Sequence, residues 1–180
     1  MAHIVILGAG LGGMPMAYEM KALARAGDTV TVISEAPKFH FVPSNPWVAV
    51  DWRQRKDIEV DIAPALQRKG IQSIIQRARR VHPDTNQIEL EDGSRVDYDY
   101  LVIATGPKLA FDEVDGLGPH GGHTQSICHV SHAETTKTAW DQFVEAPGPI
   151  VVGAVQGASC FGPAYEFAMI MDTDLRRRKI

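Results

Sequence analysis

The chain opens with a short apolar run that breaks into closely spaced glycines and continues as an amphipathic segment. The apolar run covers residues 3–7, and Gly8, Gly10 and Gly13 have the spacing G-x-G-x-x-G. This order predicts a buried parallel strand, a tight turn and a helix. The first glycine permits the turn, the second lets the backbone approach a pyrophosphate, and the third lets the helix pack closely on the strand. The sequence therefore predicts a dinucleotide site here, although such turns also occur without a ligand.

An acidic residue follows the next predicted strand at a fitting distance. Residues 29–33 are rich in β-branched side chains and lead into Ser34 and Glu35, and Glu35 lies 22 positions beyond Gly13. An acidic group there is placed to hold the ribose hydroxyls of an adenine dinucleotide. A shift of one residue in the strand register decides whether Ser34 or Glu35 faces the ribose.

The following segments continue an α/β pattern. Residues 36–57 hold three prolines and four aromatic residues, and we interpret them as a shaped loop. Residues 62–69 predict a short helix that ends at Gly70, and residues 71–76 predict a third strand. The alternation of strands with helices favours a parallel sheet.

The spacing of the apolar residues changes to a period of two between residues 77 and 98. Apolar and charged residues alternate there on both sides of the turn signal Asp92-Gly93, which predicts a β-meander. A further buried strand at residues 100–104 ends at Thr105-Gly106. By analogy at the level of the fold, this layout is typical of a Rossmann-like FAD/NAD(P)-binding fold, with a parallel sheet, helices and a meander.

A second nucleotide-type unit is predicted to start after a junction rich in glycine and proline. The pattern predicts, in order, a junction at 107–123, a helix at 131–144, a strand at 149–153 and a helix at 160–177. We therefore expect the first segment of an FAD-binding domain at residues 1–110. Residues 111–180 would be the truncated start of a second dinucleotide-type domain.

Composition excludes several classes of function. The chain has 180 residues, 22% of them charged, and a formal net charge of −4, which gives no electrostatic footprint for nucleic acid. No apolar run is long enough for a transmembrane helix, and the first apolar run lacks the basic segment of a signal peptide. Two cysteines exclude a disulfide framework and a four-cysteine zinc site, so no metal is expected. The basic run at residues 176–179 reads as the solvated end of a helix.

Cys160 is the strongest candidate for a catalytic residue in the sequence. It stands at the predicted start of a helix, where the helix N-terminus would stabilise a thiolate. In NAD(P)H-using relatives of this fold the preceding turn carries a second glycine, but Val155 occupies that position here. A nicotinamide pyrophosphate would therefore meet a side chain, which favours a sulfur substrate. A buried structural cysteine is the alternative.

Several longer stretches resemble sulfide:quinone oxidoreductases, and together they extend over the whole chain. These stretches are residues 8–15, 41–48, 98–101, 103–109, 125–128 and 157–166. Pro-Ser-Asn-Pro-Trp at 43–47 and Gly-Ala-Ser-Cys-Phe-Gly-Pro at 157–163 are far more specific than the glycine turn. Family members are much longer, and this chain resembles their N-terminal part.

The resemblance implies a flavoprotein that oxidises sulfide to polysulfide or sulfur and passes the electrons through FAD to quinone. Cys160 would work with a second cysteine across the flavin and carry a persulfide. Cys128 would be buried or auxiliary, and His132 would lie near the flavin and move protons. The candidate FAD-binding residues are Gly8, Ala9, Gly10, Leu11, Gly12, Gly13, Ser34, Glu35, Pro43, Ala78, Thr105 and Gly106.

The resemblance also implies where the complete protein works. It would sit peripherally on the bacterial cytoplasmic membrane through C-terminal segments that this chain lacks. Whether it forms a homo-oligomer is a question that the sequence leaves open. This chain alone is expected to be inactive, because the partner cysteine and most of the quinone pocket would lie beyond Ile180.

Three alternatives remain. The first is the flavoprotein subunit of a flavocytochrome c sulfide dehydrogenase, which the missing signal peptide disfavours. The second is a type II NADH dehydrogenase, which Val155 disfavours. The third is a non-catalytic FAD-binding fragment or interaction module.

Overall fold

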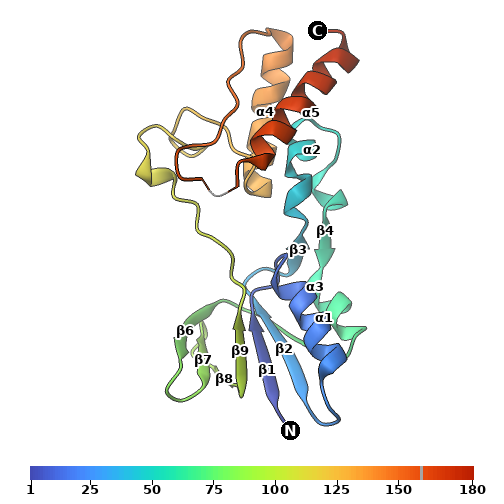
Figure 1. Cartoon of the computed structure of the whole chain (residues 1–180), viewed down its shortest axis with the longest axis vertical. Coiled ribbons are helices and arrows are strands. Elements are labelled where there is room, and N and C mark those ends of the chain that lie inside the picture. Colours follow the sequence, from blue (N-terminus) through green and yellow to red (C-terminus); the bar gives the residue numbers. More distant parts are fainter. Residues whose placement is uncertain (159) are drawn as a thin grey trace. The chain divides into compact units, whose positions relative to one another are not determined.

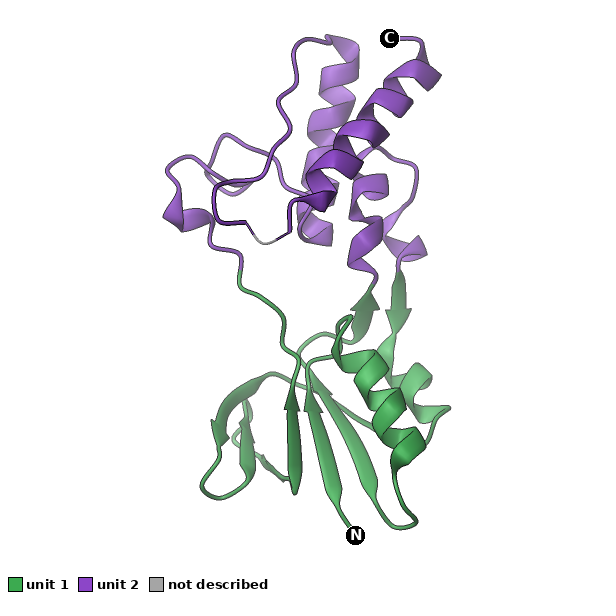
Figure 2. Cartoon of the chain, viewed as in Figure 1, with its two compact units in different colours: residues 1–40, 59–108 green, residues 41–58, 109–180 purple. Residues whose placement is uncertain are grey.

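A computed structural model of the protein describes residues 1–158 and 160–180, which form two compact units. Unit 1 comprises Met1–His40 and Glu59–Lys108, and unit 2 comprises Phe41–Ile58 and Leu109–Ile180 (Figure 2). Both units therefore consist of two separate stretches of the sequence. Ser159, within the stretch 157–166 noted above, lies outside the described residues.

Unit 1 is built on a parallel sheet of four strands (Figure 1). In their order across the sheet these are β5 (Gln72–Ile75), β2 (Thr29–Ser34), β1 (His3–Leu7) and β9 (Tyr100–Ile103). Helix α1 (Gly13–Leu23) connects β1 to β2. Helix α3 (Ile62–Gln67) precedes β5. The predicted α/β fold of Rossmann type is confirmed.

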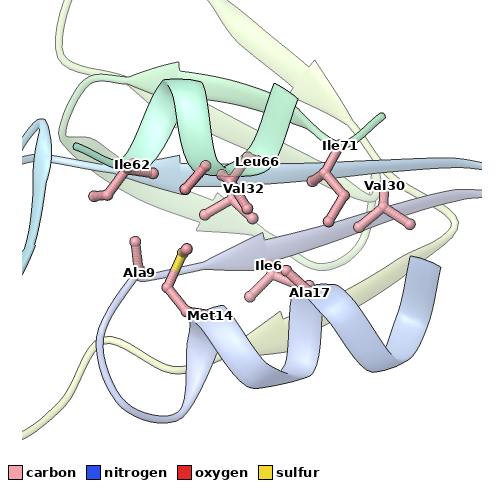
Figure 3. Packing of buried hydrophobic residues seen from close by; sticks show 10 residues of the cluster. Ile6, Ala9, Met14, Ala17, Val30, Val32, Ile62, Leu66 and Ile71 are labelled. Carbon is pink, nitrogen blue, oxygen red and sulfur yellow. The ribbon is translucent and has the colours of Figure 1, made fainter. Parts of the chain in front are cut away.

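The sheet of unit 1 is covered on both faces, as its apolar strands require. Ile6 of β1 packs with the helix residues Met14, Ala17 and Leu66 in one buried cluster (Figure 3). Val5, the neighbouring residue of β1, belongs to a second cluster with residues of the meander. Successive side chains of a strand point to opposite faces, so one short strand contributes to both cores. Complete burial of such an aliphatic side chain stabilises the fold by about 1.5–3 kcal/mol.

The meander is confirmed. Its antiparallel strands are β6 (Ala78–His82), β7 (Gln87–Leu90) and β8 (Arg95–Asp97). Ile88 and Leu90 of β7 supply its buried side chains. The turn between β7 and β8 contains Gly93 with a positive φ of 85°, a conformation that glycine adopts without steric cost.

The segment predicted as a loop is more regular than expected. Strand β3 (Lys38–His40) pairs with β4 (Glu59–Asp61). Between these two strands in the sequence come the single turn η1 (Val42–Ser44), helix α2 (Asn45–Ala49) and the single turn η2 (Arg55–Asp57). Pro43 and Pro46 each stand in the first turn of a helical element. A proline there lacks only an N–H that would have no helical partner, so these prolines start helices where we expected a loop.

Unit 2 is helical. Its long helices are α4 (Val130–Glu145) and α5 (Gly162–Arg178), and η3 (Phe111–Glu113) is a single turn. Val48 and Ala49 of α2 pack with Val130 and Ala133 of α4 in a buried cluster. These contacts make residues 41–58 part of the helical unit.

The strand predicted at residues 149–153 is wrong. None of these residues belongs to a strand, and Val151 is 98% exposed. A strand forms by pairing with a neighbour, and no described strand lies in unit 2 to pair with this apolar run. Helix α5 begins at Gly162, so Cys160 precedes the helix by two residues.

The basic end of α5 is engaged in contacts rather than simply solvated. Asp174, only 4% exposed, accepts hydrogen bonds from Trp52 Nε1 at 2.8 Å, Trp140 Nε1 at 2.8 Å and Arg178 Nε at 2.6 Å. Arg177 lies over the ring of Trp52, with its guanidinium carbon 4.2 Å from the ring centroid. Burial alone would raise the pKa of Asp174, but the hydrogen bonds from the two indoles and Arg178 outweigh burial and lower this pKa.

Candidate functional site

The glycine turn of unit 1 contains positions of two kinds. A Cβ on Gly8 would lie 2.2 Å from the carbonyl oxygen of Ala104, and a Cβ on Gly13 would lie 1.9 Å from that of Gly8. Close backbone packing therefore requires glycine at both positions. A Cβ on Gly10 would meet no atom within 4 Å. Packing of the protein does not explain Gly10, but a pyrophosphate held against the backbone would.

Helix α1 begins at the end of this turn. Gly12 is its N-cap, and no side chain of the described residues caps it. The first N–H groups of a helix have no partner inside it and carry a partial positive charge. The turn and the helix start together offer an anion the open space beside Gly10 and N–H donors next to it.

Ser34 and Glu35 have different surroundings in the structure. The Ser34 hydroxyl donates a hydrogen bond to the carbonyl of Ala36 at 2.9 Å. Glu35 is exposed, and its carboxylate lies 3.5 Å from Arg77 Nε, also exposed. This arrangement favours Glu35 over Ser34 as the ribose-binding group. Arg77, which we did not predict, places a positive charge beside it.

Thr105 and Gly106 leave the sheet next to the glycine turn. Ala104 N–H donates to the carbonyl of Leu7 at 2.8 Å. Thr105 and Gly106 follow it and are exposed. Unit 1 therefore brings the glycine turn, the end of β2 and the end of β9 to the carboxyl edge of one parallel sheet, where dinucleotides bind in this class of fold.

Ala78 and Pro43, the other candidate FAD-binding residues, lie in different units. Ala78 begins β6 and packs against the second core cluster of unit 1. Pro43 belongs to unit 2, where it lies in η1. A role for either in cofactor binding stays a prediction.

His132 lies in a cluster of imidazoles in unit 2. It is 7% exposed, and its ring centroid lies 5.2 Å from that of His120, 5.7 Å from that of His129 and 5.5 Å from that of Phe111. Burial, followed by the neighbouring His120 and His129, lowers the pKa of His132 below 6.5. These surroundings therefore favour the neutral form of the His132 imidazole. The spacing of His129 and His132, which are three residues apart at a helix start, could have indicated the cluster.

Acidification is expected to loosen this part of unit 2. Because the folded state lowers the pKa of His132, the unfolded state takes up its proton first as the pH falls through 6.5, and stability decreases until the folded-state pKa is reached. Amide exchange at the start of α4, corrected for intrinsic rates, should therefore rise between pH 7 and pH 5. His132→Phe, which keeps a ring but cannot titrate, should remove most of this rise. An equal rise in the variant would contradict the assignment.

Both cysteines are free and exposed. Cys128 was expected to be buried or auxiliary, and the first of these is wrong, as is the alternative of a buried Cys160. Cys128 N–H donates to Ser126 Oγ at 3.2 Å, and His132 Nδ1 lies 3.3 Å from the same oxygen. Cys128 and His132 are thus linked through Ser126, while Cys160 lies in a separate segment before α5.

In the residues that the structure describes, no group of three or more His, Cys, Asp or Glu could hold a metal ion. None of the described helices combines the length and the apolar character needed to cross a bilayer.

Relatives with known names match nearly the whole chain. It is 41% identical to the sulfide-quinone reductase of Aquifex aeolicus over 178 residues, which are 99% of this chain and 40% of that protein. It is 28% identical to the mitochondrial sulfide:quinone oxidoreductase of Dictyostelium discoideum, over 98% of this chain and 39% of that protein. The chain thus spans about 40% of the length of the curated relatives that it matches.

Solved structures agree with the sequence matches. The X-ray structure of the Aquifex aeolicus sulfide:quinone oxidoreductase superposes with a TM-score of 0.91 at 40% identity, covering 99% of this chain and 40% of that one. NDH2 from Plasmodium falciparum, with a TM-score of 0.63 and 21% identity over 80% of this chain and 30% of that one, shares the fold. The resemblance to sulfide:quinone oxidoreductases is confirmed.

The family is settled by a match that extends over most of the chain. Residues 2–162 match the pyridine nucleotide-disulphide oxidoreductase family, whose members bind FAD. Unit 1 has the fold and the open glycine turn that this cofactor requires. The chain therefore belongs to the pyridine nucleotide-disulphide oxidoreductases.

Proposed function

We propose that the protein containing this chain is a sulfide:quinone oxidoreductase. It oxidises sulfide to polysulfide or sulfur and delivers the electrons to quinone. The observation that carries this proposal is the 41% identity to the Aquifex aeolicus sulfide-quinone reductase over 99% of the chain. The two exposed thiols support it, since sulfur chemistry needs a sulfur that substrate can reach.

In this proposal residues 1–110 supply the first segment of the FAD-binding domain. The glycine turn holds the pyrophosphate, and Glu35 accepts hydrogen bonds from the ribose hydroxyls. Bound FAD supplies a two-electron acceptor that passes its electrons on to quinone. The full set of proposed contacts is the one predicted from the sequence: residues 8–13, Ser34, Glu35, Pro43, Ala78, Thr105 and Gly106.

Residues 111–180 supply the redox thiol. Hydrosulfide attacks a disulfide sulfur of Cys160 and displaces the thiolate of its partner cysteine, leaving Cys160 as a persulfide. His132 is proposed to move protons near the flavin, and Cys128 has an auxiliary role. We further propose that the complete protein associates with the membrane, where quinone is dissolved.

Replacement of Cys160 tests the function. In the complete protein, Cys160→Ser should lower sulfide-dependent flavin reduction on the order of a hundredfold or more, because a hydroxyl cannot form a persulfide. Flavin content should stay unchanged, since Cys160 belongs to unit 2 and the glycine turn to unit 1. Cys128→Ser is the matched control and should have a much smaller effect. Flavin reduction by Cys160→Ser at the parent rate would refute the proposed mechanism.

A further inference from the structure

Buried polar side chains from two helices meet at one irregular segment of unit 2, residues 126–128. Thr136 of α4 donates from Oγ1 to the carbonyl of Ser126 at 2.9 Å. Asn45 of α2 donates from Nδ2 to the carbonyl of Ile127 at 2.9 Å. Thr136 is 5% exposed and Asn45 is completely buried. Two consecutive carbonyls of the segment are thus held from the core.

The side chain of Ser126 extends these contacts to the next residues. Its Oγ accepts a hydrogen bond from Cys128 N–H at 3.2 Å and lies 3.3 Å from Nδ1 of the buried His132. The main chain of Ser126, Ile127 and Cys128 is therefore fixed at each residue by a polar contact. Cys128 itself is exposed.

The energetics indicate that these contacts hold the segment in place. A buried polar group without a partner costs about 1–3 kcal/mol, so the contacts with residues 126–128 help to stabilise the buried Asn45, Thr136 and His132. Residues 126–128 belong to no helix or strand, so they have no regular hydrogen-bond ladder that would fix them otherwise. The buried groups and the segment therefore order one another.

We infer that Asn45 and Thr136 are positioning residues for Cys128, which present its thiol from a fixed backbone on the surface of unit 2. The inference rests on the proposed function, because a fixed position benefits a thiol that takes part in sulfur chemistry. Reactive groups work best when surrounding contacts hold them within a few tenths of an ångström. Cys128 thereby becomes an oriented auxiliary thiol, and Thr136 acts on it through Ser126.

The test compares neighbouring threonines of α4. Thr136→Val keeps the shape of the side chain and removes the hydroxyl that donates to Ser126, whereas Thr136→Ser retains that hydroxyl. Thr135→Val is the matched control, because the Thr135 hydroxyl donates to the carbonyl of Ser131 in its own helix. Each variant is made in the complete, FAD-loaded protein, and far-UV circular dichroism checks its fold.

Two measurements report on the segment. Thr136→Val should raise amide exchange at Ile127 and Cys128 about fivefold, the effect of losing one net hydrogen bond. A nitroxide label attached at Cys128 alone should give a narrower, more mobile electron spin resonance spectrum. Thr136→Ser should restore both values, and Thr135→Val should leave both unchanged.

The outcomes separate this inference from the proposed function. Equal label mobility in Thr136→Val and the parent would overturn the positioning role, whatever the activity. Unchanged flavin reduction in Cys160→Ser would instead remove the proposed function and leave the label experiment valid. A mobile label in Thr136→Val that Thr136→Ser does not correct would also contradict the inference, since the hydroxyl would then not be the cause.

Discussion

Gly10→Val is expected to abolish FAD binding while the protein still folds, and Gly13→Ala is expected to damage the fold itself. The space around Gly10 is empty for 4 Å in the direction of a Cβ, and the residue has no positive φ, so the valine meets only the place of the pyrophosphate. At Gly13 the added methyl would stand 1.9 Å from the carbonyl oxygen of Gly8. Relief of that clash requires α1 to move away from β1, at a cost of about 3 kcal/mol, the upper end of overpacking penalties.

Two measurements on the complete protein distinguish these effects. Flavin absorbance per protein should fall to background in Gly10→Val, while the melting temperature should equal that of the parent after its flavin has been removed. Gly13→Ala should melt at a clearly lower temperature than this apoprotein. Full flavin content in Gly10→Val would show that the open space does not hold the cofactor.

Asp174→Ala is expected to cause the largest loss of stability in unit 2. The carboxylate accepts hydrogen bonds from Trp52, from Trp140 of α4 and from Arg178 of α5. Its removal leaves two indole N–H groups without their acceptor and a guanidinium without its anion. A buried donor that loses its acceptor costs about 1–3 kcal/mol, and Trp140, which is 4% exposed, becomes such a donor.

Asp172→Ala serves as the control on the same helix. Asp172 pairs with Arg176 at 2.8 Å, four residues further on, but both side chains are largely exposed. Such a pair contributes about 0.2–1 kcal/mol, so the control should be near neutral. Denaturation followed by tryptophan fluorescence compares the two variants, because Trp52 and Trp140 report directly on the site. Similar denaturation midpoints for both variants would show that the contacts of Asp174 stabilise the protein no more than the exposed pair of Asp172 and Arg176 does.

Local patterns predicted most of unit 1. The glycine turn, the alternation at Ile88 and Leu90 and the turn at Gly93 each depend on residues close in sequence, and each was found as expected. The strand at 149–153 was predicted from its apolar run, but strand formation depends on a partner that the run itself cannot specify.

Contacts between distant residues explain what the sequence did not reveal. Trp52 and Asp174 are separated by 122 positions, and no periodicity relates them. The buried Asn45 and its partner Ile127 are 82 positions apart. The backbone contacts around Cys128 are of this kind, so the sequence could not decide whether this thiol is buried or auxiliary, and the structure shows it exposed.

The pairing of β3 with β4 brings together the two places where the chain leaves and re-enters unit 1. Within unit 1, His40 and Glu59 are paired residues of this antiparallel ladder, so the chain leaves unit 1 and re-enters it at neighbouring points. Insertions between adjacent strand ends leave the host's fold uninterrupted. Residues 41–58, which lie between these two points in the sequence, therefore form an insertion in unit 1. A tight two-residue hairpin could join His40 to Glu59, and unit 1 would then be one continuous stretch of chain.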